Sequence, residues 1–171
     1  MAYLNGNNVL LAEANIKYGV GETTPEGGEI FNTYAYNKAG KNAHAQNSRC
    51  EATGENSHAG GLSSKSTAPR AFTHGWACEG NANNTVAMGG KVIMNHDSAT
   101  GLGYYLTSSR KFQANFGQFN APNSKAILVV GNGTSDTDRS NVFEVTETGS
   151  LVLNGVTITS EQLQKLLDLI S

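Results

Sequence analysis

Charged side chains are scarce in this sequence of 171 residues: they make up 15% of it, against roughly a quarter in average globular chains. The 12 basic and 14 acidic residues nearly balance, so the formal net charge is −2 at pH 7, and the basic residues form no run. Proteins that bind nucleic acid without sequence preference rely on dense positive charge. The composition therefore excludes that mode of binding, and we expect no nucleic-acid partner.

Long hydrophobic runs are also missing. No stretch approaches the ~18 consecutive apolar residues of a membrane-spanning helix. The first residues, Met1 to Asn5, lack the basic region and the apolar core of a signal peptide. We therefore expect synthesis in the cytoplasm and no membrane insertion.

Large apolar side chains are few. Leu, Ile, Val and Phe together make up only about a fifth of the chain, which is little for a conventional layered core. Disorder, the alternative at this composition, requires a high net charge that the chain lacks. Gly, Asn, Ser, Thr and Ala fill the sequence instead. This composition favours a repetitive β-architecture, because small side chains can stack in layers while backbone groups pair along the stack.

Cysteines and catalytic motifs are equally sparse. Two cysteines are too few for a disulfide scaffold. The sequence has no glycine-rich phosphate loop, no Gly-x-Ser-x-Gly elbow and no metalloprotease motif. His96, Asp97 and Ser98 have the residue types of a hydrolase triad, but sequence neighbours cannot converge as a triad must. We therefore expect no enzymatic activity, no catalytic residue and no cofactor.

What the sequence does contain is a seven-residue repeat through its middle. The first position of each unit is small, the fourth and sixth positions are small in the first seven units, and a variable residue lies between these two. The units begin at Gly40, Asn47, Gly54, Gly61, Ala68, Gly75, Ala82 and Gly89. This alternation is typical of a short strand whose side chains point alternately inward and outward.

A coiled coil has the same period, but it needs large apolar residues at two positions per heptad, where this sequence has Ala, Ser and Cys. We therefore predict an all-β fold with a parallel β-roll over residues 34–90. Two heptads would make one turn of two short strands. Cys50 and Cys78 would then lie two turns, or ~9.6 Å, apart along the axis. Because a disulfide needs Cα atoms within about 7 Å, we expect two free, buried thiols.

Part of the repeat resembles a known family. The segment from Ala39–Ala45 through Asn56–Gly61 is similar to the head repeats of YadA-like trimeric autotransporter adhesins. The resemblance covers about residues 34–90 and implies a left-handed parallel β-roll in a threefold bundle. Downstream, Ile127–Asp136 and Arg139–Val145 resemble a segment common in phage tail-fibre and other virion appendage proteins. Together the two resemblances imply a trimeric phage structural protein located in the virion.

Two further regions flank the roll. Residues 1–33 hold short apolar runs broken by turn residues, which predicts an N-terminal cap or attachment region. In residues 91–156 larger side chains replace the small-residue register, which predicts a compact β-rich domain. Within it, Ile127–Val130 and Val142–Val145 are expected to pair as strands of a hairpin.

The last segment, residues 157–171, predicts a helix. Thr159 is a capping residue with Gln162 three positions later. A helix of about twelve residues is marginal alone in water, so its apolar stripe needs a partner. The stripe either docks on its own domain or mediates trimerisation, and the repeat context favours trimerisation. Its residues are Leu163, Leu166, Leu167 and Ile170.

Two pairs of residues have metal-ligand types. His44 and His58 occupy equivalent outward positions one turn apart and would stack ~4.8 Å from each other. Asp136 and Asp138, with Glu144 and Glu147 after them, partly match a calcium loop, although Asn141 stands where the sharp turn requires Gly. We favour packing for the histidines and a turn held by Asp and Arg for the loop. A metal ion at either pair remains the alternative.

From these observations we predict a homotrimeric virion fibre or appendage that binds other virion proteins and attaches to a glycan or protein of the host surface. One alternative is a purely structural capsid-decoration or head-fibre protein without a host ligand. Another is a glycan-degrading tailspike, which requires paired carboxylates in a groove, whereas Asp and Glu are scattered here. Trp76, Tyr104 and Tyr105 could stack on sugars, although packing is the simpler explanation for each.

Overall fold

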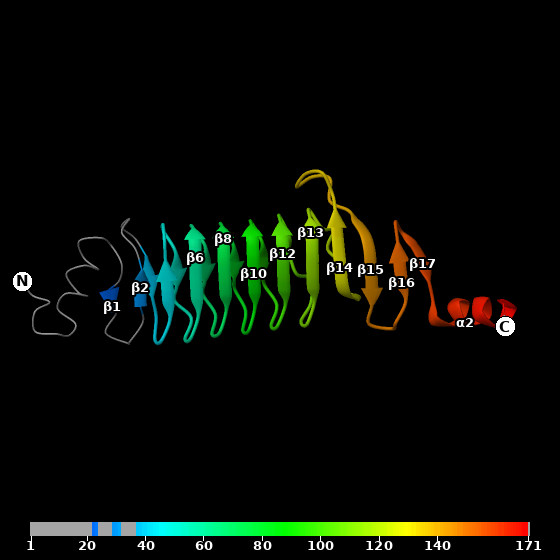
Figure 1. Cartoon of the computed structure of the whole chain (residues 1–171), viewed down its shortest axis with the longest axis horizontal. Helices are drawn as coiled ribbons and strands as arrows, with labels where there is room; N and C mark the ends of the chain where they lie inside the picture. Colours follow the sequence, from blue (N-terminus) through cyan, green and yellow to red (C-terminus); the bar gives the residue numbers. More distant parts are fainter. Residues whose placement is uncertain (1–21, 24–28, 32–36, 171) are drawn as a thin grey trace, which may run out of the picture.

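The computed structural model describes residues 22–23, 29–31 and 37–170, and it shows a rod of stacked β-coils that ends in one helix (Figure 1). Apart from β1 (Glu22–Thr23) and β2 (Glu29–Phe31), the expected cap or attachment region at residues 1–33 lies outside the described residues. Within the described ranges, no helix has the length and apolar character needed to cross a bilayer.

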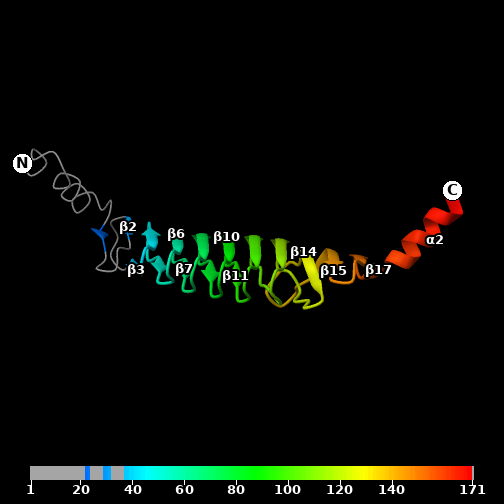
Figure 2. The ribbon, with the colours of Figure 1, turned by 90° about the horizontal axis from the view of Figure 1, so that it is seen from below.

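Through β11, each coil contributes one strand to each of two sheets, which form two layers along the rod (Figure 2); beyond β11 the second layer continues only as a bridge from Ile93 to Thr107. Strands pair in parallel with the residue fourteen positions later, as in Phe72↔Val86 and Val86↔Thr100. This confirms a β-solenoid in which two heptads make one turn. The longer strands are β4 (His44–Gln46), β6 (His58–Leu62), β8 (Phe72–Trp76), β10 (Val86–Gly90), β12 (Thr100–Tyr104), β13 (Ala114–Gln118) and β14 (Ala126–Asn132). The shorter ones are β3 (Lys38–Ala39), β5 (Glu51–Ala52), β7 (Lys65–Ser66), β9 (Glu79–Gly80) and β11 (Ile93–Met94).

The interior consists of columns of buried side chains that repeat every coil. In the first coils these side chains are small, as Ala45, Cys50 and Ala59 show. Further along the rod they grow, as Cys78 is followed by Val92 and Leu106 in one column. One column consists of Ala45, Ala59, Thr73, Ala87, Gly101, Asn115 and Val129. A second column consists of Cys50, Ser64, Cys78, Val92, Leu106 and Asn120.

The structure places the end of the solenoid at β14, not at residue 90, where a compact domain was expected. β12, β13 and β14 continue the parallel stack with the same register. The larger side chains fit because a glycine lies beside them: a Cβ on Gly101 would be 2.6 Å from Val92 Cγ1 and 2.7 Å from Met94 Cε. The small-residue register thus gives way to paired large and small residues while the fold continues.

After β14 the chain changes to antiparallel pairing. The predicted hairpin is confirmed: β14 pairs with β15 (Asn141–Thr146), as in Val130↔Phe143. β16 (Leu151–Leu153) and β17 (Val156–Ile158) extend the same sheet. After β14, the described residues therefore form only these short hairpins and α2, and not a separate compact domain.

Buried amides close this end of the interior. Gln113 Nε2 donates to the carbonyls of Asn123 and Ala126, each at 2.8 Å. Asn120 Nδ2 donates to the Thr107 carbonyl at 2.9 Å. Buried polar groups cost little when they are hydrogen-bonded. The columns can therefore end on polar side chains without an exposed apolar core.

The C-terminal helix α2 (Ser160–Ile170) begins with the predicted cap. The backbone N–H of Gln162 donates to Thr159 Oγ1 at 3.2 Å, and the backbone N–H of Thr159 donates to Gln162 Oε1 at 2.9 Å. This is a reciprocal capping box. No residue of α2 is buried, and the helix extends beyond the last strand (Figures 1 and 2).

Candidate functional site

The two sheets of the solenoid expose different chemistry. The sheet of long strands presents large apolar side chains to solvent, each at least 36% exposed, and we call this surface the apolar face. The residues are Leu62, Phe72, Trp76, Met88, Leu102, Tyr104 and Phe116. The sheet of short strands presents mainly charged and amide side chains, and we call it the polar face. Its outward residues include Glu51, Lys65, Thr67, Glu79, Asn81, Asn95 and Thr107.

Ladders of polar side chains run from coil to coil along the polar face. Thr67 Oγ1 donates to Asn81 Oδ1 at 3.2 Å, and Asn81 Nδ2 donates to Asn95 Oδ1 at 3.0 Å. At the corners, Lys41 pairs with Glu55 at 2.7 Å. Exposed pairs of this kind add little stability each. Their regular spacing nevertheless keeps this side of the rod hydrophilic.

Histidines lie at the start of the apolar face. His44 and His58 pair in register one coil apart, and their rings stack with centroids 5.0 Å apart, as the repeat predicted. His58 also stacks on Phe72 at 4.6 Å. Burial, helped by repulsion from His44 and His74, lowers the pKa of His58 to about 4. His58 is therefore neutral at pH 7 and belongs to the apolar face.

No three His, Cys, Asp or Glu side chains of the described residues gather closely enough to hold a metal ion. The loop between β14 and β15 shows how its acidic residues are used instead. Asp136 accepts from Arg139 Nε at 3.0 Å, and Asp138 accepts from Thr134 Oγ1 at 2.6 Å. The two carboxylates thus bind different partners within the loop, in the arrangement of a turn held by Asp and Arg.

The other two carboxylates of the proposed calcium set lie elsewhere. Glu144 is nearly buried and accepts from Asn123 Nδ2 at 2.9 Å and from Asn141 Nδ2. Glu147 pairs with Arg110 at 2.6 Å. The four acidic residues therefore act as separate structural groups.

His96, Asp97 and Ser98 form part of a corner, as expected. His96 Nδ1 lies 3.1 Å from Ser108 Oγ in the next coil. Asp97 accepts from the Asn83 amide N–H at 3.1 Å and pairs with Lys111 at 3.0 Å. These contacts join neighbouring coils.

Cys50 and Cys78 are free and fully buried. They occupy the same inward column two coils apart, as predicted. Burial raises the pKa of both thiols above its ordinary value. They fill the interior as small apolar groups and are poor nucleophiles.

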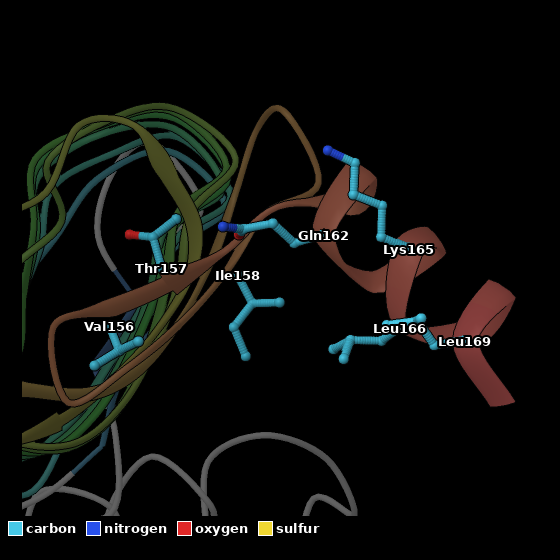
Figure 3. Close-up of a pocket in the computed structure, with 7 residues that line it drawn as sticks. All are labelled: Val156, Thr157, Ile158, Gln162, Lys165, Leu166 and Leu169. Atoms are coloured by element: carbon cyan, nitrogen blue, oxygen red, sulfur yellow. The ribbon is translucent and has the colours of Figure 1, made fainter.

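The C-terminal helix borders an apolar cavity of about 430 Å³ (Figure 3). Val156 and Ile158 of β17 face Leu166 and Leu169 of α2 across it. Leu163, Leu166, Leu167 and Ile170, which the sequence nominated for oligomerisation, are all exposed. Leu169 was missed because it lies off the predicted stripe. The sequence could have indicated Leu169, because residues three positions apart are neighbours on a helix surface and Leu169 follows Leu166 by three.

Trp76, Tyr104 and Tyr105 come together at one corner of the solenoid. The Tyr105 ring stacks on Phe119 at 4.8 Å and contacts Tyr104 edge to face at 4.7 Å. The Lys91 ammonium lies 4.8 Å from the centroid of Tyr105 and 5.4 Å from that of Trp76. A hydrogen bond with the Tyr105 side chain raises the pKa of Lys91. Phe119 and Lys91 thus already engage the Tyr105 ring, which fits packing better than sugar stacking.

A second cavity, of about 410 Å³, lies beside this corner, and we call it the loop pocket. Its floor comes from the polar face, and its rim comes from the loop at residues 133–140. Sequence reasoning missed it because its residues come from segments far apart in the sequence, from Ala77 to Arg139, which only coil stacking brings together. The side chains that line it include Glu79, Lys91, Ile93, Asn95, Tyr105, Thr107, Asp136 and Arg139.

The fold therefore defines the chain as a parallel β-solenoid protein with an apolar face, a polar face and an exposed terminal helix. No family model, curated protein or solved structure matches the chain.

Proposed function

We propose that this chain is the subunit of a homotrimeric virion fibre or appendage. In this assembly three solenoids pack through their apolar faces, and three α2 helices pack through their leucine stripes. The observation that carries the proposal is the contrast between the two faces. Seven large apolar side chains are exposed on one sheet, with Met88, Leu102 and Phe116 adjacent in register, although monomeric proteins rarely expose large contiguous apolar patches.

The interior of the solenoid supports the same conclusion. Ala, Ser, Thr and Cys fill much of it, and burial stabilises by only ~25 cal/mol per Å² of apolar surface. A single chain therefore gains little from its own core. Covering the apolar face would add burial that the isolated chain lacks.

The helix supports assembly independently. An isolated helix shorter than ~12–15 residues is marginal in water, and α2 has 11 residues, none of them buried. Partner helices from other copies would cover Leu163, Leu167 and Ile170. The cavity beside Leu166 and Leu169 would receive side chains from the same bundle.

The number of copies and the virion location rest on sequence resemblance. Residues 34–90 resemble YadA-like head repeats, which form threefold bundles. Residues 127–145 resemble virion appendage segments. In this proposal the N-terminal region attaches to the particle and the opposite end contacts the host, or the order is reversed. A purely structural virion protein with the same fold is the second candidate.

Light scattering coupled to size exclusion, on the full chain at micromolar concentration, tests the assembly. We expect a mass three times the 18.0 kDa of one chain. A folded monomer would overturn the trimer. Antibody labelling of virus particles tests the location, and a particle without label would overturn the virion assignment.

A further inference from the structure

We infer that the loop pocket is a binding site for a neutral saccharide unit. The inference deepens the proposed function, since it rests on attachment to the host surface and names the ligand class. The pocket has about 410 Å³ of space, within the ~300–1,000 Å³ range of small-molecule sites.

The walls of the pocket are pre-organised. Three successive coils supply its floor through Glu79, Ile93 and Thr107, which lie one above another on the polar face. These side chains stand on hydrogen-bonded strands and bridges, so their spacing is fixed by the solenoid. A ligand that fits them would lose little affinity to reordering of the protein.

Arg139 fixes the loop that forms the rim. Its Nη1 donates to the Tyr105 carbonyl at 2.8 Å and to the Asn120 carbonyl at 3.1 Å, across the corner of the solenoid. Its Nε donates to Asp136 at 3.0 Å. The guanidinium thus joins the loop to the coils and holds the Asp136 carboxylate at the pocket.

The lining matches the hydrogen-bonding capacity of sugar hydroxyls, which both donate and accept. Glu79 and Asp136 offer carboxylate acceptors, and Lys91 offers an ammonium donor. Asn95 and Thr107 can do both, and the Ile93 side chain offers an apolar surface for the C–H groups of a sugar ring. The two carboxylates balance Lys91 and Arg139, so the pocket favours a ligand without net charge.

The position of the pocket agrees with the proposed trimer. Its floor lies on the polar face, and its wall of Lys91 and Tyr105 lies at the corner beside Trp76 and Tyr104. An interface centred on Met88 and Leu102 of the apolar face would leave the three floors open to solvent. Individually weak sites gain strength when several of them engage one surface. Three copies on one particle appendage would therefore bind a glycan-coated surface more tightly than one.

The test is a microarray of immobilised neutral and acidic saccharides, probed with the full chain after its oligomeric state is measured in the same sample. We expect binding to a subset of neutral saccharides. Titration calorimetry with the free saccharide should then show at least a tenfold loss of affinity in Asn95→Ala and in Glu79→Gln.

Two matched controls occupy the same columns two coils away, outside the pocket: Thr67→Ala for Asn95, and Glu51→Gln for Glu79. Both should bind like the unmodified chain. The inference is overturned if no saccharide binds, if only acidic saccharides bind, or if the pocket variants bind as well as their controls. Because the oligomeric state is measured separately, an unmodified chain that is trimeric but binds no neutral saccharide contradicts the pocket alone and leaves the proposed assembly standing.

Discussion

Gly75 shows how closely the coils approach at one corner of the solenoid. Its φ is +129°, and a Cβ built there would lie 2.0 Å from the carbonyl oxygen of Gly89 in the next coil. Gly89 has the same relation to Gly103, at 1.9 Å. Gly75 and Gly89 are therefore required for two reasons: an L side chain rarely adopts this backbone conformation, and a Cβ would clash with the next coil.

We predict that Gly75→Ala destabilises the fold by about 3 kcal/mol or more, since backbone strain and a backbone clash act together. The midpoint of thermal unfolding, followed by circular dichroism, measures this. Gly155→Ala is the matched control: its φ is +79°, but no atom lies within 4 Å of the added Cβ. It should cost only the conformational strain of an L-residue in the left-handed region, ~1–2 kcal/mol. Equal effects of the two substitutions would show that coil stacking does not restrict Gly75.

At the scale of elements, the α2 helix tests whether its leucine stripe has a partner. We predict that a chain ending at Ile158 forms fewer or weaker trimers and unfolds at a lower temperature. None of the α2 residues that the truncation removes is buried, so in a monomer it would change the melting temperature little. Sedimentation equilibrium and thermal unfolding on both forms measure the effect.

A point variant separates helix packing from mere length. Leu163→Asp lies on the stripe and should weaken assembly like the truncation. Gln164→Asp, its neighbour on another helix face, should leave assembly unchanged. If truncation and Leu163→Asp both leave oligomeric state and stability as they were, α2 is a tail without a partner.

The elements also show what the sequence could predict. The fourteen-residue turn followed from the seven-residue spacing of small residues, because two heptads, each with one short strand and one turn, make one coil. The helix followed from Thr159 and Gln162, since a capping box is a local interaction. The end of the solenoid did not follow, because the interior columns change from small residues to Val92 and Leu106 while Gly101 and other small neighbours compensate. The continuing series Gly103, Gly117 and Gly131 carried that signal.

The loop pocket could not be predicted for a different reason. Glu79, Asn95 and Thr107 are ordinary outward residues of their coils, and Asp136 and Arg139 belong to a turn. Only stacking brings the coils under the loop. Each of these segments, taken alone in the sequence, has no pattern that indicates a binding site. The site exists only because the fold places the segments side by side.

At the scale of the whole molecule, the rod is amphipathic in cross-section, and this predicts which face is covered in the assembly. Met88 and Leu102 are paired in register at the centre of the apolar face, 39% and 38% exposed. Lysines at both positions would place charge in the proposed interface, where burying an unpaired ammonium costs several kcal/mol. We predict that Met88→Lys with Leu102→Lys converts the trimer to smaller species.

The control places the same charges on the polar face, as Thr67→Lys with Asn81→Lys, at exposed positions also one coil apart. It should leave the trimer intact, since that face stays in water. Light scattering at matched micromolar concentrations compares the two double variants, with circular dichroism to verify folding. A folded Met88→Lys, Leu102→Lys variant that remains trimeric would show that the copies do not meet through the apolar face.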